Sequence, residues 1–526
     1  MVVQICNNSF VLGVSIVAVS AVWAVVQRSR EITRKRRTKK EYEEELDVPY
    51  ERINDSVASL LLKTITTKDD DDEGDQRSCI YLDYNGTTPI REEVVRAMIP
   101  YLTSHFGNPS STHYYGTKPR EAIQRARYQI ATSLLISPPH ANDILIPAAN
   151  SSSVTSDREN AVCNSIIFTG CGTEANNMAI HLAINSWNAG VPNKRGGDND
   201  DNDNNNKAGC TSIPHVVTST VEHPAIVECL KFLERGNHIE TTYVKVDEEG
   251  IVSATDIMSA VKSNTCLVTL MLANNESGAI MPVCEVARFC RSRGILFHTD
   301  AAQAVGKIDV SLEHQLGDAD MVTLVGHKFG APKGVAALYV RPGCLRENGR
   351  GDPYLYTRSG ALLLGGGQEM GRRAGTENVP YIVGMGEAAT LVSAGPKLAQ
   401  NAVRMEELRT RLIQNLTKDL GADRIRVNGP QDAKRRLPNT LSVGIKDIHS
   451  GELLRCIGNE VAASAGSACH SSGAKVSSVL LAMNVPMNFA KGTLRLSVGF
   501  DTTEVQIDDA TKVITREVRR QWATLA

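Results

Sequence analysis

Three apolar runs lie close together in the second half of the sequence, and polar residues follow them. The runs are Ile295–His298, Met321–Val325 and Val335–Val340. Their length and β-branched content are typical of buried strands in a covered sheet. Asp300 follows the first run and Lys328 follows the second. Ligands of open α/β sheets bind at the carboxyl ends of the strands, so both positions are candidates for chemistry.

Four earlier apolar runs alternate with segments of helical periodicity. They are Ser165–Thr169, His215–Thr220, Thr241–Val246 and Cys266–Leu272. This alternation predicts a largely parallel sheet with helices on both faces. From about Gly386, helical patterns and a few strands predict a smaller C-terminal domain. We therefore expect an α/β large domain over residues 79–385 and a small α/β domain over residues 386–526.

The N-terminal region has a different pattern. Phe10–Val26 is an uncharged, nearly all apolar run that reaches the lower length limit of a membrane-spanning helix. Basic residues follow this run and none precedes it, which favours an anchor over a cleaved signal peptide and predicts that the rest of the chain lies in the cytosol. The alternatives are an organelle-targeting leader, for a mitochondrion or plastid, and a cytosolic protein. Residues 1–30 are thus the predicted anchor or targeting segment.

Charged and polar segments predict a linker and two surface loops. Residues 31–78 are basic and then acidic, and they bury too little apolar surface to fold alone. Residues of about 148–160 and 193–209 form polar inserts, which we interpret as disordered loops. The Asp/Asn run of the second insert lacks the ligand spacing of an EF-hand, so no metal site is predicted.

Composition narrows the class of protein. A chain of 526 residues exceeds a single hydrophobic core, so at least two domains are expected. Its 42% hydrophobic and 22% charged residues are ordinary for a soluble globular protein, and a net charge of −2 gives no basic signature for nucleic acid. The 12 cysteines include no C-x-x-C pair, which argues against a zinc cluster or a disulfide scaffold.

Lys328 and Asp300 suggest a specific chemistry. Lys328 lies between Gly326 and Gly330, directly after a predicted buried strand, where it can lose solvation and a proton and become nucleophilic. Asp300 at a neighbouring strand end could keep a ring nitrogen protonated. This pair is the one that pyridoxal phosphate (PLP) enzymes use. The alternative is a surface lysine in a turn and a capping aspartate.

Three further strand ends carry polar residues. The glycine-rich turn Gly170–Glu174 opens a helix and so forms an anion site, to which Thr173 could add its hydroxyl. His223 follows another strand and could stack on a ring and move protons, or only cap a helix. Asn275 could bond a ring hydroxyl, or only form a turn.

Ordered motifs over most of the chain carry a family resemblance. They are YLDYNGTTP, GNPSSTH, FTGCGTEANN, VEHPAI, LANNESG, HTDAAQAVGK, VGHKFGAPKG, GGGQEMGRRAGTEN, RLPNT, SAGSACHSS and GTLRLSVGFDTT. The chain from Ile80 to about Val513 resembles the class V aminotransferase family, in its cysteine desulfurase and selenocysteine lyase branch. The resemblance implies a PLP-dependent enzyme of fold type I, with a mostly parallel seven-stranded sheet.

The resemblance assigns each part of the cofactor to residues of this chain. It implies that Lys328 forms the Schiff base, Asp300 pairs with the pyridine nitrogen, His223 stacks on the ring and acts in catalysis, Asn275 and Gln303 bond the ring oxygen, and Gly172, Thr173 and His327 hold the phosphate. Thr376 would contact the phosphate of the neighbouring subunit, which implies a homodimer with shared sites.

The substrate side of the site is also implied. Arg495 would bind the substrate carboxylate, a role that suits the planar fork of arginine, and Asn85 would be a second substrate-binding residue. Cys469 matches the cysteine that accepts sulfur or selenium. Its Gly/Ser-rich surroundings predict a mobile, exposed loop, as a reactive thiol needs. The alternative for Cys469 is an inert buried thiol, which fits these surroundings poorly.

Two positions depart from the family pattern. Val325 stands where the family has a Ser or Thr that contacts the phosphate, and Cys171 stands where glycine is common. The motifs TLVGHKF, GGGQE and ACHS resemble those of selenocysteine lyases more than those of the general cysteine desulfurases. We therefore expect removal of selenium or sulfur from L-selenocysteine or L-cysteine, which leaves L-alanine.

Other functions remain as alternatives. One is a cysteine desulfurase that passes persulfide sulfur to an acceptor protein, for iron–sulfur clusters or thio-cofactors. An aminotransferase or another β-eliminating lyase would need no exposed Cys469 loop. A membrane-tethered scaffold without activity would have no use for Lys328, Asp300, His223 and Arg495. The preferred substrate, the acceptor, the membrane or organelle and the fate of the N-terminal segment are left open by the sequence.

Overall fold

Seven apolar strands form one sheet in the computed structural model, which describes residues 79–136, 162–189, 213–345, 362–393, 396–465 and 476–525. The strands are β2 (Ile166–Thr169), β3 (His215–Ser219), β4 (Glu240–Val244), β5 (Thr265–Thr269), β6 (Leu296–Asp300), β7 (Met321–Val325) and β8 (Ala336–Val340). Their order is β2-β8-β7-β6-β5-β3-β4. β8 is antiparallel to both of its neighbours, and all other pairs are parallel. The predicted strands are thus confirmed, with ends shifted by up to three residues.

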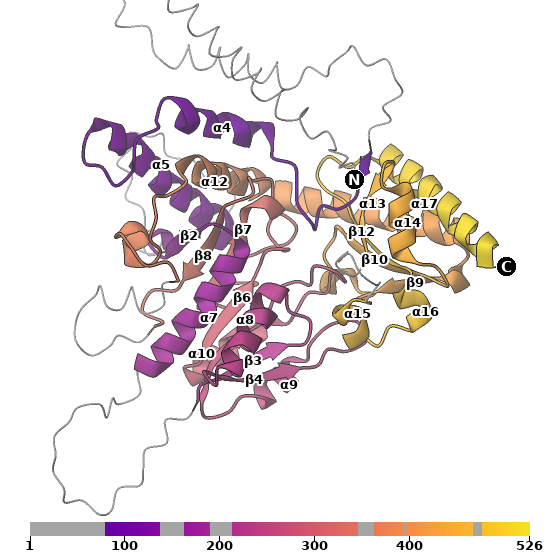
Figure 1. Ribbon diagram of the computed structural model, residues 1–526, viewed down its shortest axis with the longest axis horizontal. Coiled ribbons are helices and arrows are strands. Elements are labelled where there is room, and N and C mark those ends of the chain that lie inside the picture. Colours follow the sequence, from indigo (N-terminus) through magenta and orange to yellow (C-terminus); the bar gives the residue numbers. More distant parts are fainter. Residues whose placement is uncertain are drawn as a thin grey trace, which may run out of the picture. The chain divides into compact units, whose positions relative to one another are not determined.

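Helices cover both faces of this sheet. Successive strand residues alternate between two hydrophobic clusters; Val216 belongs to one and Val217 to the other. One cluster includes residues of α4 (Glu92–Thr103), α5 (Tyr114–Ile130), α9 (Ala254–Ser259), α10 (Val283–Arg293), α12 (Val379–Ser393), α15 (Ser478–Ala482) and α16 (Met487–Ala490). The other includes residues of α7 (Gly172–Ala189) and α8 (Pro224–Arg235). Figure 1 shows α12 beside α5, and the two helices pack together.

A second, smaller sheet lies in the C-terminal part. Its strands are β9 (Ile425–Asn428), β10 (Thr440–Ile445), β12 (Ser464–Ala465) and β13 (Thr493–Ser497), in the order β12-β13-β10-β9. They share a hydrophobic cluster with α13 (Lys397–Leu420), α14 (Ser450–Ile457) and α17 (Glu504–Leu525). The predicted domain boundary at residue 385 stays a prediction, because the described body from Cys79 onward falls in a single compact unit and α12 spans that position.

The first described residues connect with this C-terminal part. β1 (Ile80–Tyr81) pairs in parallel with β11 (Val461–Ala462), and Leu82 is buried in the cluster of the smaller sheet. The turn that follows, Asp83–Thr88, lies next to the Gly326–Lys328 turn of the large sheet, where Thr88 N donates to the His327 carbonyl at 2.9 Å. This contact brings groups of both sheets to one place.

Several predictions concern residues that the structure does not describe. They are the run Phe10–Val26, the linker 31–78, the inserts of about 148–160 and 193–209, and Cys469 with its loop. Within the described ranges, no helix is both long enough and apolar enough to cross a membrane.

Candidate active site

The predicted site residues follow strands that end at the same edge of the large sheet. β6 ends at Asp300, and β7 runs into a short 3₁₀ turn, Gly326–Lys328. His223 caps α8 after β3, and α7 begins at Gly172 after β2. Because β2, β3, β6 and β7 point in one direction, their carboxyl ends share an edge.

The Lys328 amine is held by the turn that precedes α4. Its Nζ donates to the carbonyls of Asn85 at 2.6 Å and Gly86 at 2.8 Å. Burial lowers the pKa of Lys328 from its usual value to about 8, and the charge of Arg495 adds to this effect. Asp83 and Asp300 act in the opposite direction. A substantial neutral fraction therefore exists near physiological pH, as a nucleophilic lysine requires.

Asp300 is buried and its carboxylate is fixed in orientation. Oδ2 accepts from Nδ2 of Asn176 at 2.7 Å, and Oδ1 accepts from the backbone N of Ala302 at 2.9 Å. Asn176 was not among the residues predicted from the sequence. It lies one turn into α7, after the glycine-rich start, so the helix that begins at the predicted phosphate site also holds Asp300.

His223 both caps α8 and presents an exposed ring. Its Nδ1 accepts from the backbone N of Ala225 at 3.1 Å, so the neutral ring carries its proton on Nε2. The pKa of His223 is lowered, chiefly because protein atoms displace water around the ring; the charge of Asp300 opposes this shift, and the charge of Lys328 adds a smaller lowering. The predicted alternative, that His223 caps a helix, is therefore confirmed. Its Nε2–H is not used by the cap, and the catalytic role of His223 stays a prediction.

Glu222 pins the turn that carries His223. It is fully buried and accepts from the Ser219 hydroxyl at 2.6 Å and from Met271 N at 3.0 Å. Burial, and to a smaller extent the charge of Asp300, raises the pKa of Glu222 to about 8. The signal in the sequence was an acidic residue directly after an apolar run.

The glycine-rich turn is packed against β7. A Cβ on Gly172 would lie 2.5 Å from Cγ2 of Val325, so only glycine fits above that valine. Thr173 is exposed at the first turn of α7. Cys171 is exposed as well, and its Sγ accepts from the backbone N of Glu174 at 3.4 Å. The two departures from the family pattern therefore have structural roles here.

His327 contacts the same N-terminal turn as Lys328. Its Nδ1 lies 3.1 Å from Oγ1 of Thr87. Burial and the charges of Lys328 and Lys333 lower the pKa of His327 to about 4, so the ring is neutral. The predicted phosphate role of His327 stays a prediction.

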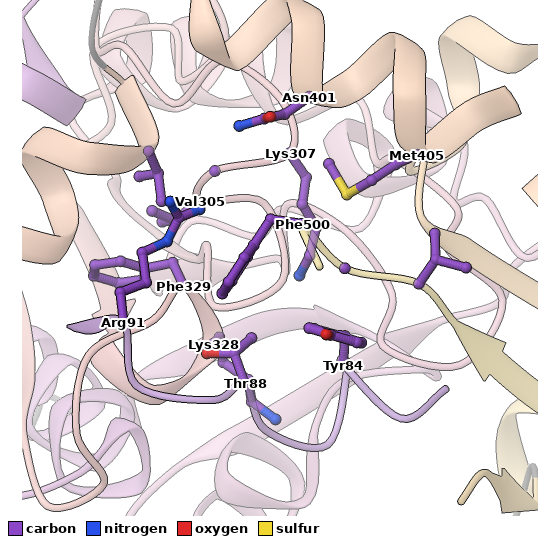
Figure 2. A pocket seen from close by; sticks show the side chains of 14 residues that line it. Tyr84, Thr88, Arg91, Val305, Lys307, Lys328, Phe329, Asn401, Met405 and Phe500 are labelled. Atoms are coloured by element: carbon purple, nitrogen blue, oxygen red, sulfur yellow. The ribbon is translucent and has the colours of Figure 1, made fainter. Parts of the chain in front are cut away.

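Gln303 and Lys328 share one acceptor. Nε2 of Gln303 donates to the Asn85 carbonyl at 3.1 Å, the same oxygen that Lys328 contacts. Lys307, which the sequence analysis missed, donates from Nζ to the Gln303 carbonyl at 2.9 Å. Figure 2 shows Lys307 reaching into the pocket beside Tyr84 and Phe500, which Lys328 also lines.

Arg495, from β13 of the smaller sheet, reaches the same site. Its Nη2 donates to Oδ1 of Asp83 at 2.7 Å, and its Nη1 donates to the Asn275 carbonyl at 3.3 Å. The Asn275 side chain is half-buried. Asp83 was not among the predicted site residues, because nothing in the local sequence indicates its partner.

The Asn85 side chain is held by structural partners. Its Nδ2 donates to Oγ1 of Thr440 at 2.8 Å and to the Asn275 carbonyl at 3.2 Å, while Oδ1 accepts from Asn439 at 3.0 Å. Both amide hydrogens are thus in use, and substrate binding by Asn85 stays a prediction. Thr376 is exposed in the loop before α12.

Comparison with known proteins places the chain in a family. Residues 80–145 and 206–509 match the family described as Aminotransferase class-V. A cysteine desulfurase of Trichormus azollae is 38% identical over 445 residues, 84% of this chain and 94% of that protein. The cysteine desulfurase IscS of Clostridium botulinum (strain Hall) is 34% identical over 443 residues, 84% of this chain and 95% of that protein.

Solved structures give the same result. A NifS-like protein superposes with a TM-score of 0.66 at 29% identity, over 84% of this chain and 100% of that chain. A NifS-like protein of Rickettsia africae superposes with a TM-score of 0.63 at 25% identity, over 84% and 99%. The predicted fold type I is confirmed. The chain belongs to the class V aminotransferase family, in its cysteine desulfurase branch.

Proposed function

We propose that this protein removes sulfur from L-cysteine with the help of PLP and leaves L-alanine. One observation carries the proposal: an amine of lowered pKa and an arginine lie in one site. Lys328 contacts the Asn85 carbonyl, and Arg495 contacts the Asn275 carbonyl, to which the Asn85 side chain also donates. Lys328, which handles the amine, and Arg495, which would bind the carboxylate, are thus both connected to Asn85, Arg495 through the Asn275 carbonyl.

The donor set fits PLP, which members of this family use. Asp300 would pair with the pyridine nitrogen, and Lys328 would bind the cofactor covalently. The phosphate would lie at the start of α7, where Gly172 lets the turn pack directly on Val325 and where the first backbone N–H groups of a helix have no acceptor within the helix. His223 would stack on the ring, and Asn275 and Gln303 would bond its oxygen. Bound PLP supplies an electron sink for the substrate Cα.

The residues of the chain would carry out the remaining steps. Arg495 would orient the substrate carboxylate, and Lys328, with a pKa of about 8, would take and return the proton at Cα. Cys469, which lies outside the described residues, would attack the substrate sulfur as a thiolate. As the S–S bond of the persulfide forms, the Cβ–S bond of the substrate breaks, and its electron pair stays with the substrate carbon, which takes up a proton to give L-alanine. An acceptor protein would then take the sulfur.

Alanine formation by the PLP-loaded chain tests this function. We expect alanine from L-cysteine with the native protein and none with Lys328→Ala. Cys469→Ala should abolish persulfide formation, while cofactor absorption persists. Turnover by Lys328→Ala at the native rate would contradict the scheme. A cofactor spectrum without any turnover would favour the non-catalytic scaffold.

Selenocysteine is the second candidate substrate. The presence of Val325 in place of a Ser or Thr, and the ACHS loop, favour it. The carboxylate and amine contacts are common to both amino acids, so rates on L-cysteine and L-selenocysteine must be measured in parallel. Activity on selenocysteine alone would make the protein a selenocysteine lyase. Comparable rates would make it a desulfurase.

A homodimer is part of the proposal. The exposed loop that carries Thr376 is suited to reach the phosphate of a second subunit. Sedimentation analysis should give twice the chain mass. In addition, Thr376→Ala should release PLP more readily from an intact dimer. A monomer that binds PLP normally would contradict this part.

We further propose that the N-terminal segment anchors the protein to a membrane, with the body in the cytosol. The support is the apolar run Phe10–Val26 and the basic residues after it. Fractionation of cells that express the full chain, compared with a chain lacking residues 1–30, tests this. Cleavage of the segment inside an organelle would favour the targeting alternative.

A further inference from the structure

The guanidinium of Arg495 is already paired with a carboxylate of its own chain. Asp83 contacts it through a single oxygen, Oδ1, at 2.7 Å from Nη2. Among the described residues, Nε of Arg495 has no partner although it is buried. Because a carboxylate that engages two nitrogens of the fork is held more strongly than one that engages a single nitrogen, the fork is only partly satisfied.

Gly86 permits this pairing. A Cβ at Gly86 would lie 2.4 Å from Oδ2 and 2.9 Å from Cγ of Asp83, so the carboxylate lies against the bare Cα. The backbone here is fixed, since the Tyr81 hydroxyl lies between two carbonyls to which its single hydrogen can be donated, Asp83 at 3.1 Å and Thr87 at 3.0 Å. A larger residue at position 86 would therefore displace the Asp83 side chain rather than the turn.

The pair is shielded and lies beside Lys328. The side chains of Arg495 and Asp83 are 12% and 24% exposed, so their attraction is screened less than that of a surface pair. Arg495 lowers the pKa of Lys328 and Asp83 raises it. Asp83 is thus paired with Arg495 and lies close enough to Lys328 for its charge to be felt there, which is the electrostatic position expected for the carboxylate of a substrate.

We propose that Asp83 is a resident competitor of the substrate carboxylate. Asp83 occupies the guanidinium of Arg495 in the free protein and must leave it when an amino acid binds. The free energy of the Asp83–Arg495 contact therefore weakens the binding of carboxylate ligands. No covalent bond changes in this exchange. The inference rests on the proposed function, in which Arg495 binds the substrate carboxylate.

Binding of propionate isolates the exchange, because propionate has the carboxylate but neither the amine nor the sulfur. The dissociation constant is measured by calorimetry on the full, PLP-loaded chain. We expect Asp83→Asn to bind propionate about tenfold more tightly, the lower end of what one charge-assisted hydrogen bond contributes. Gly86→Ala should act in the same direction with all charges kept. Asp508→Asn, which removes a charge paired with Arg411 elsewhere, should bind as the native chain does.

The opposite result would show that Asp83 positions Arg495. Weaker or unchanged propionate binding in both Asp83→Asn and Gly86→Ala overturns the inference, as does a lack of binding by every variant. The KM for L-cysteine should fall in both variants. Arg495→Gln separates the two proposals: if it binds propionate normally, the carboxylate site of the proposed function is wrong. If it loses binding while Asp83→Asn is unchanged, only the role of Asp83 is wrong.

Discussion

Nδ2 of Asn176 lies 2.7 Å from Oδ2 of Asp300, and both side chains are buried. The contact joins α7 to the end of β6. Because α7 also begins at the predicted phosphate turn, one helix would fix two contact points for the cofactor, the proposed phosphate site through its N-terminus and the proposed pyridine partner through Asn176. The distance between these points is therefore set by a rigid element rather than by loops.

Asn176→Ala is expected to weaken PLP binding by about tenfold. The carboxylate of Asp300 would lose one of its two hydrogen bonds, a loss of ~1 kcal/mol or somewhat more. Titration of the cofactor-free chain with PLP, followed by absorption, measures the affinity. Asn177→Ala is the matched control, since Asn177 donates to the Ala225 carbonyl at 2.8 Å and does not contact Asp300. Equal affinities of the two variants would contradict the role of Asn176.

Cofactor uptake is expected to accelerate as the pH rises through about 8. The attacking form of Lys328 is the neutral amine, and the pKa of Lys328 is lowered to about 8, so the reactive fraction increases up to and beyond that pH. Stopped-flow absorption of the cofactor-free chain mixed with PLP gives the profile. Arg495→Gln should move the midpoint to higher pH, because the charge of Arg495 lowers the pKa of Lys328. A midpoint that stays in place or falls would show that this charge is not felt.

Gly172→Ala should destabilise the site through a single steric contact. The new Cβ would lie 2.5 Å from Cγ2 of Val325, and overpacking of this kind costs ~1–3 kcal/mol. The midpoint temperature of thermal unfolding and the affinity for PLP should both fall. The double variant Gly172→Ala with Val325→Ala removes the clashing methyl groups and should recover most of the loss. Additive effects in this double-mutant cycle would show that the two residues do not meet.

The sequence predicted the large sheet well because its strands are buried on both faces. Runs such as Met321–Val325 are apolar throughout, and such runs depend little on their partners. The sequence also allowed Lys328, Asp300 and His223 to be predicted as site residues, because each lies at or just after the end of a strand. Contacts between residues far apart in the sequence could not be predicted. Asp83 is 412 residues from Arg495, and Asn85 is 354 residues from Asn439. Only the folded chain brings these residues together.

Glu222 should make the fold less stable as the pH rises. Its pKa is about 8 in the folded protein, above the usual value of 4.5, so the folded state holds a proton that the unfolded state has lost between these values. Stability is therefore lost progressively from about pH 4.5 to pH 8. The side chain that Glu222→Gln introduces carries no charge at any pH, so the stability of this variant should not decrease over that range for this reason.

The comparison needs urea denaturation of both proteins at pH 6 and pH 9. The stability of Glu222→Gln relative to the native chain should be greater at pH 9, when the buried carboxylate of the native protein is ionised. Glu228→Gln provides the control, because Glu228 lies on the surface of α8 and pairs with Lys231. A pH-independent difference for Glu222→Gln would mean that the hydrogen bonds from Ser219 and Met271 keep Glu222 ionised throughout, and that desolvation is the smaller effect.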